Sequence, residues 1–233
     1  MQYKSVKEAQ FISRENRFVA TVILDGEPIK VHVKNTGRCR ELLQPGAKVF
    51  LSDSENLERK YRYDLVAVEK SGLLINMDSQ APNQAFGEFL RAGGLVDGVT
   101  YIKPEYKYGN SRIDFYFERR DERHLVEVKG VTLEQDGICR FPDAPTIRGT
   151  KHLKELTKAA GEGYHAWICF VVQMDGMRWL EPNELTDPDF AAALRSAAAA
   201  GVKVCAFQCE VKPNDMEMTI TLPVHLTMQQ RHN

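Results

Sequence analysis

The stretch from residue 166 to 174, AWICFVVQM, is apolar at every position but one. A strand with one solvated face alternates apolar and polar residues, whereas an unbroken apolar run is typical of a central strand covered on both faces. Helical patterns lie on either side of it, from about residue 147 to 160 and from 187 to 201. This order predicts a layered α/β or α+β domain in the second half of the chain.

The first third of the chain has a different pattern, in which short alternating runs are separated by Gly, Pro, Asn and Ser. A short helix is expected at residues 36–43, capped by Asn35 or Thr36. Several short strands and one helix in so short a segment fit a small closed barrel, and an OB-like fold is the obvious candidate. The expected strands span residues 17–26, 28–34, 47–52, 63–70 and 72–77.

The segment DSQAPN, residues 78–83, resembles a linker. It places the OB-like domain at residues 1–80 and a second domain at residues 81–233. An apolar edge near the C-terminus could pair with a second copy, so the sequence allows an oligomer. In the second domain we expect a helix at 83–95, two strands within 111–133, a loop at 134–146 and a last strand at 202–211.

Composition excludes several classes of protein. The chain has 233 residues, 43% of them hydrophobic, which favours a globular fold over disorder. Its 31 Lys and Arg against 32 Asp and Glu give no general affinity for polyanions, so any nucleic-acid site depends on local clustering.

The five cysteines form no CxxC pair and are expected to be buried thiols. The first residues lack the apolar core of a secretory signal, and we expect a cytoplasmic protein without membrane contact.

The most informative stretch for chemistry is SRIDFYFERRDERHLVEVKGVTL, residues 111–133, which reads as two strands joined by a turn at Arg120 and Asp121. Residues two apart share a face of a strand, so Glu127 and Lys129 point together. The hairpin register places Asp114 directly opposite Glu127, and alternation places Asp114 on the face of Tyr116. Two facing carboxylates repel each other by up to about 1 kcal/mol.

A divalent cation reverses that repulsion. Mg²⁺ typically takes one or two carboxylates and completes its shell with water and substrate phosphate. Lys129 would then orient the attacking water or stabilise the charged phosphorane, which is the logic of metal-assisted phosphodiester hydrolysis. The alternative is an ordinary surface salt bridge on a solvated sheet face.

Two helices offer further groups. Glu88, on the helix before the two strands, could supply a third oxygen to the metal, or it is a plain surface residue. On the helix at 147–160, Arg148 is followed by Lys151, Lys154 and Lys158 at helical spacing. Next to a metal site these cations would track a phosphate backbone, and otherwise they form a solvated helix face.

At these residues the sequence is similar to the sugar fermentation stimulation protein A family. The resemblance rests on RIDF, VEVKGVTL and the specific stretch FPDAPTIRGTKHLKEL, and it extends from NRFVATV and KNTGR near the start to LPVHL near the end. Members of this family are described as DNA-binding and are linked to sugar (maltose) metabolism. The resemblance implies an N-terminal OB-like domain and a C-terminal, restriction-endonuclease-like domain of the PD-(D/E)xK nuclease type, with a mixed sheet flanked by helices.

Carried over residue by residue, the resemblance implies that Asp114 and Glu127 hold the metal and that Lys129 is the motif lysine. Glu88 matches the acid often found on the first core helix. The motif name PD-(D/E)xK has Pro before the first acid, and in this sequence that position is Ile113. Other residues are tolerated there within the superfamily. The resemblance also gives a possible role to the loop before the second long helix, with Asp143 near the metal and Arg148 on phosphate. Turn and capping roles explain Asp143 and Thr146 equally well.

The barrel carries two basic clusters, one near His32 and the other interleaved with Tyr61 and Tyr63. Basic groups among aromatics grip single-stranded or distorted nucleic acid, although a solvated strand with packed tyrosines gives the same pattern. Three further histidines are not spaced as metal ligands would be, and we expect them to be structural: His124, His152 and His165. The two clusters consist of Lys34, Arg38 and Arg40, and of Arg59, Lys60 and Arg62.

Taken together, the residues and the resemblance predict a DNA-binding protein with a Mg²⁺- or Mn²⁺-dependent phosphodiesterase centre. Two alternatives stay open at this point. One is a non-catalytic DNA-binding regulator of sugar metabolism that uses the nuclease fold as a scaffold. The other is a sugar- or metabolite-binding factor, whose DNA affinity would be indifferent to salt.

Overall fold

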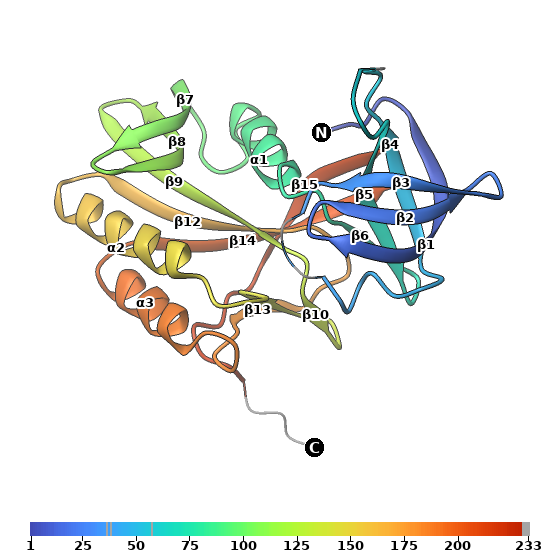
Figure 1. The fold of residues 1–233 in the computed structure, drawn as a ribbon. Helices are drawn as coiled ribbons and strands as arrows, with labels where there is room; N and C mark the ends of the chain where they lie inside the picture. Colours follow the sequence, from blue (N-terminus) through green and yellow to red (C-terminus); the bar gives the residue numbers. More distant parts are fainter. Residues whose placement is uncertain (36, 38, 57, 230–233) are drawn as a thin grey trace.

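The computed structural model describes residues 1–35, 37, 39–56 and 58–229. Figure 1 shows a barrel of strands packed against a larger layered domain. The barrel segment contains β1 (Val6–Asn16), β2 (Val19–Leu24), β3 (Glu27–Val33), β4 (Lys48–Asp53), β5 (Tyr63–Lys70) and β6 (Leu73–Asn76).

Five of these strands close into a ring. β1, β2 and β3 form an antiparallel meander, and β1 also pairs with β4, which pairs with β5. The ring closes where β3 runs parallel to β5, with Val33 beside Leu65. Closure removes the exposed strand edges, and the inward-facing residues, among them Val22, Val31 and Val49, are fully buried. The predicted OB-like barrel is confirmed.

The helix expected at residues 36–43 was wrong. The described part of this segment forms turns, with no helical residue. Asn35 makes an Asx turn, because its side-chain oxygen accepts a hydrogen bond from the Gly37 amide at 2.8 Å. Cys39 has a φ of 45°, in the left-handed region that a right-handed helix cannot include. The local side-chain bond therefore competes successfully with the helix.

The second domain has a central sheet, three helices and a small side sheet. Its elements are α1 (Ala81–Arg91), β7 (Val99–Tyr108), β8 (Ser111–Arg119), β9 (Glu122–Val131), β10 (Glu134–Gln135), β11 (Ile138–Phe141), α2 (Ile147–Gly161), β12 (His165–Val172), β13 (Trp179–Pro182), α3 (Pro188–Ala199), β14 (Lys203–Lys212) and β15 (Asp215–Leu222).

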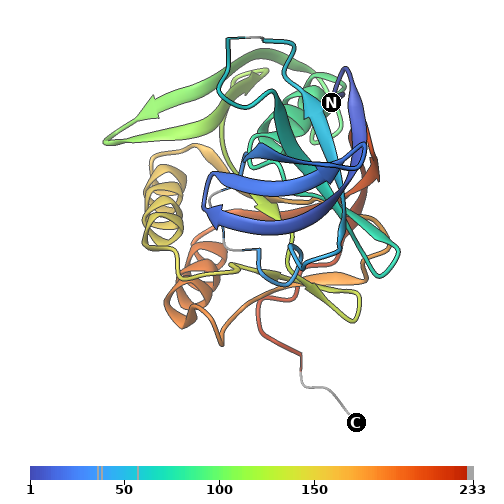
Figure 2. The same ribbon diagram turned by 45° about the vertical axis from the view of Figure 1, so that its right-hand side comes forward.

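The central sheet is mixed and has the order β15-β14-β12-β9-β8-β7. β12 runs parallel to both of its neighbours, and the outer pairs are antiparallel. α1 lies on one face of the sheet and α2 and α3 on the other, as Figures 1 and 2 show from two directions. β12 is buried from Ala166 to Val172, as the apolar run predicted. The predicted α/β class, with a mixed sheet flanked by helices, is confirmed.

The β8–β9 hairpin turns at Arg120 and Asp121, as predicted. Its register is the expected one from Arg119 opposite Glu122 to Phe115 opposite Val126, and the ladder then stops. The expected alternation fails at the same place. Ile113 packs in the cluster of Tyr116, whereas Asp114 reaches toward α1 and does not share the face of Tyr116.

Several strands carry no clear sequence signal. β1 is rich in charge, and β7 is an edge strand with charged residues and a proline. β13 is only four residues long, and β15 forms the other edge of the sheet. The expected loop at 134–146 contains the short strands β10 and β11. Within the described residues, no helix has the length and apolar character needed to cross a membrane.

Candidate active site

Glu127 and Lys129 lie near the carboxyl end of β9 and point to the face covered by α2. Val126, just before Glu127, and Val128, between Glu127 and Lys129, pack on the opposite face, which α1 covers. This is what period-two alternation requires. The Lys129 ammonium donates to the Glu127 carboxylate at 2.5 Å. Only 2% of the Glu127 side chain is exposed. The alternative of a salt bridge on a solvated sheet face is therefore excluded, because Glu127 is buried and only 15% of the Lys129 side chain is exposed.

A histidine that was expected to be only structural completes the contacts of Glu127. His152, on α2, makes a hydrogen bond through Nδ1 to the same Glu127 oxygen that accepts from Lys129. Its other ring nitrogen, Nε2, accepts from the Arg148 guanidinium at 3.4 Å. Nδ1 is then the donor to Glu127. The spacing of Arg148 and His152, four residues apart on the helix that follows β9, is the signal that could have indicated this chain of contacts.

Asp114 occupies the position where the β8–β9 ladder ends. One of its oxygens accepts the Val128 amide at 2.8 Å, in place of a backbone carbonyl. The other accepts from the side-chain amide of Asn83, on the first turn of α1, at 2.9 Å. Asn83 is a contributor that the sequence did not single out. Both oxygens of Asp114 are thus fixed between α1 and β9.

The two carboxylates influence each other electrostatically. Burial and then the charge of Glu127 raise the pKa of Asp114 above its ordinary value. Burial also acts to raise the pKa of Glu127, but the hydrogen bond from His152 and the charge of Lys129 outweigh it and keep the pKa below its ordinary value. The charged form is favoured at Glu127. Asp114 is the member whose charge is disfavoured.

One carboxylate oxygen in this site makes no hydrogen bond. Oε2 of Glu127 is buried and has no hydrogen-bond partner. An unpaired buried carboxylate oxygen whose charge acts on a second carboxylate fits a hard cation, which would both pair with the oxygen and relieve the repulsion. No group of three or more His, Cys, Asp or Glu side chains in the described part of the chain is arranged to hold a metal ion. Two carboxylates are enough for Mg²⁺, which completes its shell with water and phosphate.

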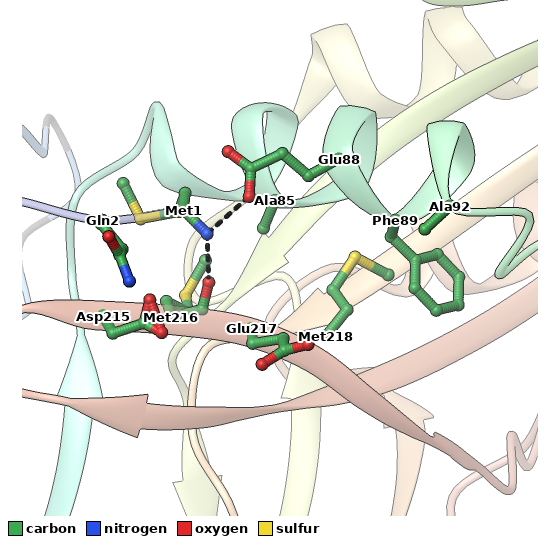
Figure 3. Close-up of a pocket in the computed structure, with 10 residues that line it drawn as sticks. All are labelled: Met1, Gln2, Ala85, Glu88, Phe89, Ala92, Asp215, Met216, Glu217 and Met218. Carbon is green, nitrogen blue, oxygen red and sulfur yellow. Dashed lines mark hydrogen bonds and ion pairs between the residues drawn. The ribbon is translucent and has the colours of Figure 1, made fainter.

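Glu88 does not contact this pair. It lies farther along α1, where its carboxylate is 2.7 Å from the amino group of Met1 (Figure 3). The Met1 amino group also donates to the backbone oxygen of Met216 on β15. Glu88 and Asp114 do line a common groove of about 420 Å³ between α1 and β7. The α1 residue that touches the catalytic candidates is Asn83, not Glu88.

Three of the basic residues predicted to bind nucleic acid on the barrel form ion pairs with nearby acidic side chains. Lys34 is 2.6 Å from the buried carboxylate of Asp78. Arg59 donates to both oxygens of Asp64, and Arg62 donates twice to one oxygen of Asp53. Lys60 lies over the ring of Tyr61, and Arg40 is exposed. Arg38 lies outside the described residues.

On α2 the basic residues divide between two faces. Arg148 lies on the side of His152 and the carboxylates. Lys151 and Lys154 are on the outer face, away from the buried side chains Leu153 and Leu156, where Lys151 is 3.9 Å from Glu155. The structure therefore brings Arg148, but not the lysine stripe, to the carboxylate pair.

The loop that enters α2 has a capping role. Thr146 is the N-cap of α2, and its hydroxyl accepts from the Gly149 amide at 3.0 Å. Asp143 is exposed and makes no hydrogen bond or ion pair within the described residues; it lines a cavity between the barrel and the second domain. It does not touch Asp114 or Glu127.

Comparison with protein families identifies both parts of the chain. A model described as "SfsA N-terminal OB domain" matches residues 12–77, and one described as "Sugar fermentation stimulation protein RE domain" matches residues 80–215. The chain belongs to the sugar fermentation stimulation protein family. The family resemblance predicted from the sequence is confirmed.

Relatives of known name cover almost the whole chain. A sugar fermentation stimulation protein homolog from Desulfitobacterium hafniense (strain Y51) is 49% identical over 217 residues, covering 93% of this chain and 95% of the relative. A homolog from Ruminiclostridium cellulolyticum is 46% identical over 226 residues, covering 97% and 100%. The solved structure of Pyrococcus furiosus SfsA in complex with Ca²⁺ is 28% identical, with a TM-score of 0.88 over 97% of this chain and 98% of that one.

Proposed function

We propose that this member of the sugar fermentation stimulation protein family is a divalent-metal-dependent phosphodiesterase that cleaves DNA. The observation that carries the proposal is the half-buried Asp114 together with the buried Glu127, whose partnerless Oε2 belongs to the carboxylate that binds the Lys129 ammonium. Buried carboxylate oxygens are nearly always hydrogen-bonded in native proteins, so a partnerless oxygen that lies within reach of a second carboxylate's charge calls for a ligand. The Ca²⁺ named with the Pyrococcus furiosus relative supports the choice of a hard cation.

Each side chain has a role that follows from its contacts. Asn83 and the Val128 amide orient Asp114, and His152 with Lys129 holds one oxygen of Glu127 so that Oε2 stays available. When bound, Mg²⁺ or Mn²⁺ would supply Lewis-acid stabilisation of the phosphate and acidify a water. The Lys129 ammonium orients the nucleophile or stabilises negative charge that develops on the phosphate oxygens.

Cleavage and binding assays with the Lys129→Ala variant test the proposal. Plasmid, single-stranded DNA and RNA are incubated with Mg²⁺ or Mn²⁺, and binding is measured separately by fluorescence anisotropy. We expect wild-type protein to cleave DNA, and the variant to lose at least about 100-fold of the rate while its affinity for DNA is kept. Lys212→Ala, which removes an exposed lysine of β14, is the matched control and should cleave normally.

Binding of DNA without cleavage by either metal would contradict the proposal and leave the non-catalytic regulator. DNA affinity that does not change between low and moderate salt, together with thermal stabilisation by a sugar, would instead indicate a metabolite-binding factor. Phosphate contacts predict a steep loss of affinity over this range of salt concentration.

A further inference from the structure

A cavity of about 380 Å³ lies between the barrel and the second domain. Its walls come from the barrel segment around Asn35 and Gly37, from the end of β9, and from the segment that enters α2. Residues from two of the sequence motifs that mark the family therefore meet here, Asn35 and Gly37 of the first and Asp143 to Thr146 of the second, although they lie about a hundred residues apart. The volume suits one nucleoside and is too small for a duplex.

The cavity lies beside the proposed active site. Gly130, the residue after Lys129, and Thr132 contribute to its wall, and three residues of strand span about 10 Å. The wall continues with Gln173, directly after β12. The cavity thus opens at the carboxyl ends of two parallel neighbouring strands, where open α/β sheets place their ligands. A group bound in it would lie about one nucleotide away from Glu127.

The walls are held in place by hydrogen bonds that cross between the domains. The side-chain amide of Gln173 donates to the backbone oxygens of Asn76 and Asp78. On the barrel side, the Asn35 amide donates to the Met77 oxygen at 2.8 Å. A wall fixed before the ligand arrives lowers the entropy cost of binding.

The charge of the lining excludes phosphate and favours a hydrogen-bond donor. Among the described residues of the lining, the one guanidinium is that of Arg140, and the buried carboxylate of Glu181 binds it at 2.8 Å. Asp143 keeps a carboxylate with no hydrogen bond or ion pair to any described residue. An anion here would meet the Asp143 carboxylate, with which no described cation pairs, whereas N–H groups would find two acceptor oxygens side by side.

We propose that this cavity binds the base of the nucleotide next to the scissile phosphate and that Asp143 selects guanine. Guanine presents a ring N–H and an amino group next to each other, so both can donate to one carboxylate. Adenine and cytosine pair their amino group with an acceptor nitrogen, and thymine has a single N–H between two carbonyls. A base can enter only if it is unpaired, so the substrate is a single strand or a flipped nucleotide.

This inference rests on the proposed function for the choice of a nucleotide, but binding to the cavity is measured without cleavage. Isothermal titration with the four 2′-deoxynucleoside 5′-monophosphates is done in Ca²⁺ on wild-type protein, Asp143→Asn and Asp121→Asn. Asp121 is the matched control, because it loses the same charge at an exposed turn at the opposite end of β9. Thermal unfolding establishes that each variant is folded.

We expect wild-type protein and Asp121→Asn to bind dGMP about tenfold more tightly than the other three nucleotides. Asp143→Asn should lose that tenfold preference and retain the weaker common affinity. Equal affinity of the wild type for all four nucleotides, or undiminished dGMP preference in Asp143→Asn, would overturn the inference. So would an equal loss for all four nucleotides together with weaker Mn²⁺ binding, since Asp143 would then be a metal ligand.

Cleavage of single-stranded oligonucleotides with one guanine separates this inference from the proposed function. If dGMP binds selectively but no strand is cut, the cavity assignment stands and the phosphodiesterase fails. If strands are cut without regard to guanine, and equally by Asp143→Asn, the phosphodiesterase stands and the cavity assignment fails.

Discussion

At the scale of single residues, Glu127 is the side chain on which the site depends. Its contacts with Lys129 and His152 use one oxygen and leave the other partnerless in a buried position. Asp114, nearby, has its pKa raised by burial and by the charge of Glu127. Such an arrangement costs stability in the absence of a cation, and functional sites are where proteins accept that cost.

The substitution Asp114→Asn separates stability from metal binding. The new amide oxygen still accepts from Val128, the Asn83 amide can turn so that its oxygen accepts from the new NH₂, and the repulsion with Glu127 disappears. Without metal the free energy of unfolding should therefore be unchanged or higher by up to about 1 kcal/mol. The stabilisation that Mn²⁺ gives wild-type protein should be lost. Thermal unfolding with EDTA and with Mn²⁺ measures both effects, and equal Mn²⁺ stabilisation of variant and wild type would refute the assignment of Asp114.

A second residue-scale prediction concerns acid stability. His124 is buried between Phe117 and His165, and burial followed by the charge of His165 lowers its pKa to about 4, against an ordinary value of 6.5. The unfolded chain therefore binds a proton more readily than the folded protein below pH 6.5. This residue's contribution to stability is complete above pH 6.5 and is lost as the pH falls toward 4.

Replacing the imidazole tests that prediction. His124→Phe preserves a ring beside Phe117 but leaves the Trp167 indole N–H without its acceptor, so we expect lower stability at pH 8 by about 1–3 kcal/mol. Between pH 6.5 and 4, however, stability should fall less steeply than in wild-type protein. Chemical denaturation at several pH values measures the slope, and identical slopes would show that His124 does not titrate in this range.

At the scale of elements, the sequence predicted those whose pattern is repeated over many residues. The apolar run of β12, the amphipathic α2 and the hairpin turn at Arg120 and Asp121 were all correct. It failed where one side chain changes the backbone: Asn35 replaces a helix by an Asx turn, and Asp114 ends a ladder. Edge strands such as β7 and β15 were missed because solvent on their exposed sides permits charged residues.

The residues of the candidate site were likewise predictable only where a repeated pattern fixes their direction. Glu127 and Lys129 were predictable because alternation within one strand fixes their common direction. His152 and Asn83 come from α2 and α1, and their contacts with the carboxylates depend on how the helices pack on the sheet; within one element, only the four-residue spacing of Arg148 and His152 gave a signal. Glu88 was the reasonable choice on α1 by family pattern, but the helix directs it to Met1.

One carboxylate ties the starts of two helices together. Asp187 accepts the Phe190 amide of α3 at 2.9 Å with one oxygen and the Thr146 amide, at the start of α2, at 2.7 Å with the other. Asp187→Ala should lower the free energy of unfolding by about 2–3 kcal/mol, because one buried and one partly buried amide lose their charged acceptor. Urea denaturation measures this. The exposed neighbour Asp189, changed to Ala, should cost less than about 1 kcal/mol, and equal effects of the two variants would contradict the capping role.

At the scale of the whole molecule, the barrel and the sheet are joined next to the site. Gln173 donates to Asn76 and Asp78, its backbone oxygen accepts from the Asn76 amide, and one buried cluster includes side chains of both parts. The two domains should therefore unfold in a single transition. Gln173→Ala, which removes the donor, should lower the unfolding midpoint or separate the transition into two, as differential scanning calorimetry would show. Two transitions already present in wild-type protein would contradict this coupling.

The most direct test of the central claim is a crystal structure of the protein soaked in Mn²⁺, with anomalous scattering used to locate the ion. We predict a peak between Asp114 and Glu127, about 2.0–2.3 Å from Oε2 of Glu127. A peak absent from this position, or found only at another group of acids such as Glu88 and Glu217, would contradict the assignment of the active site.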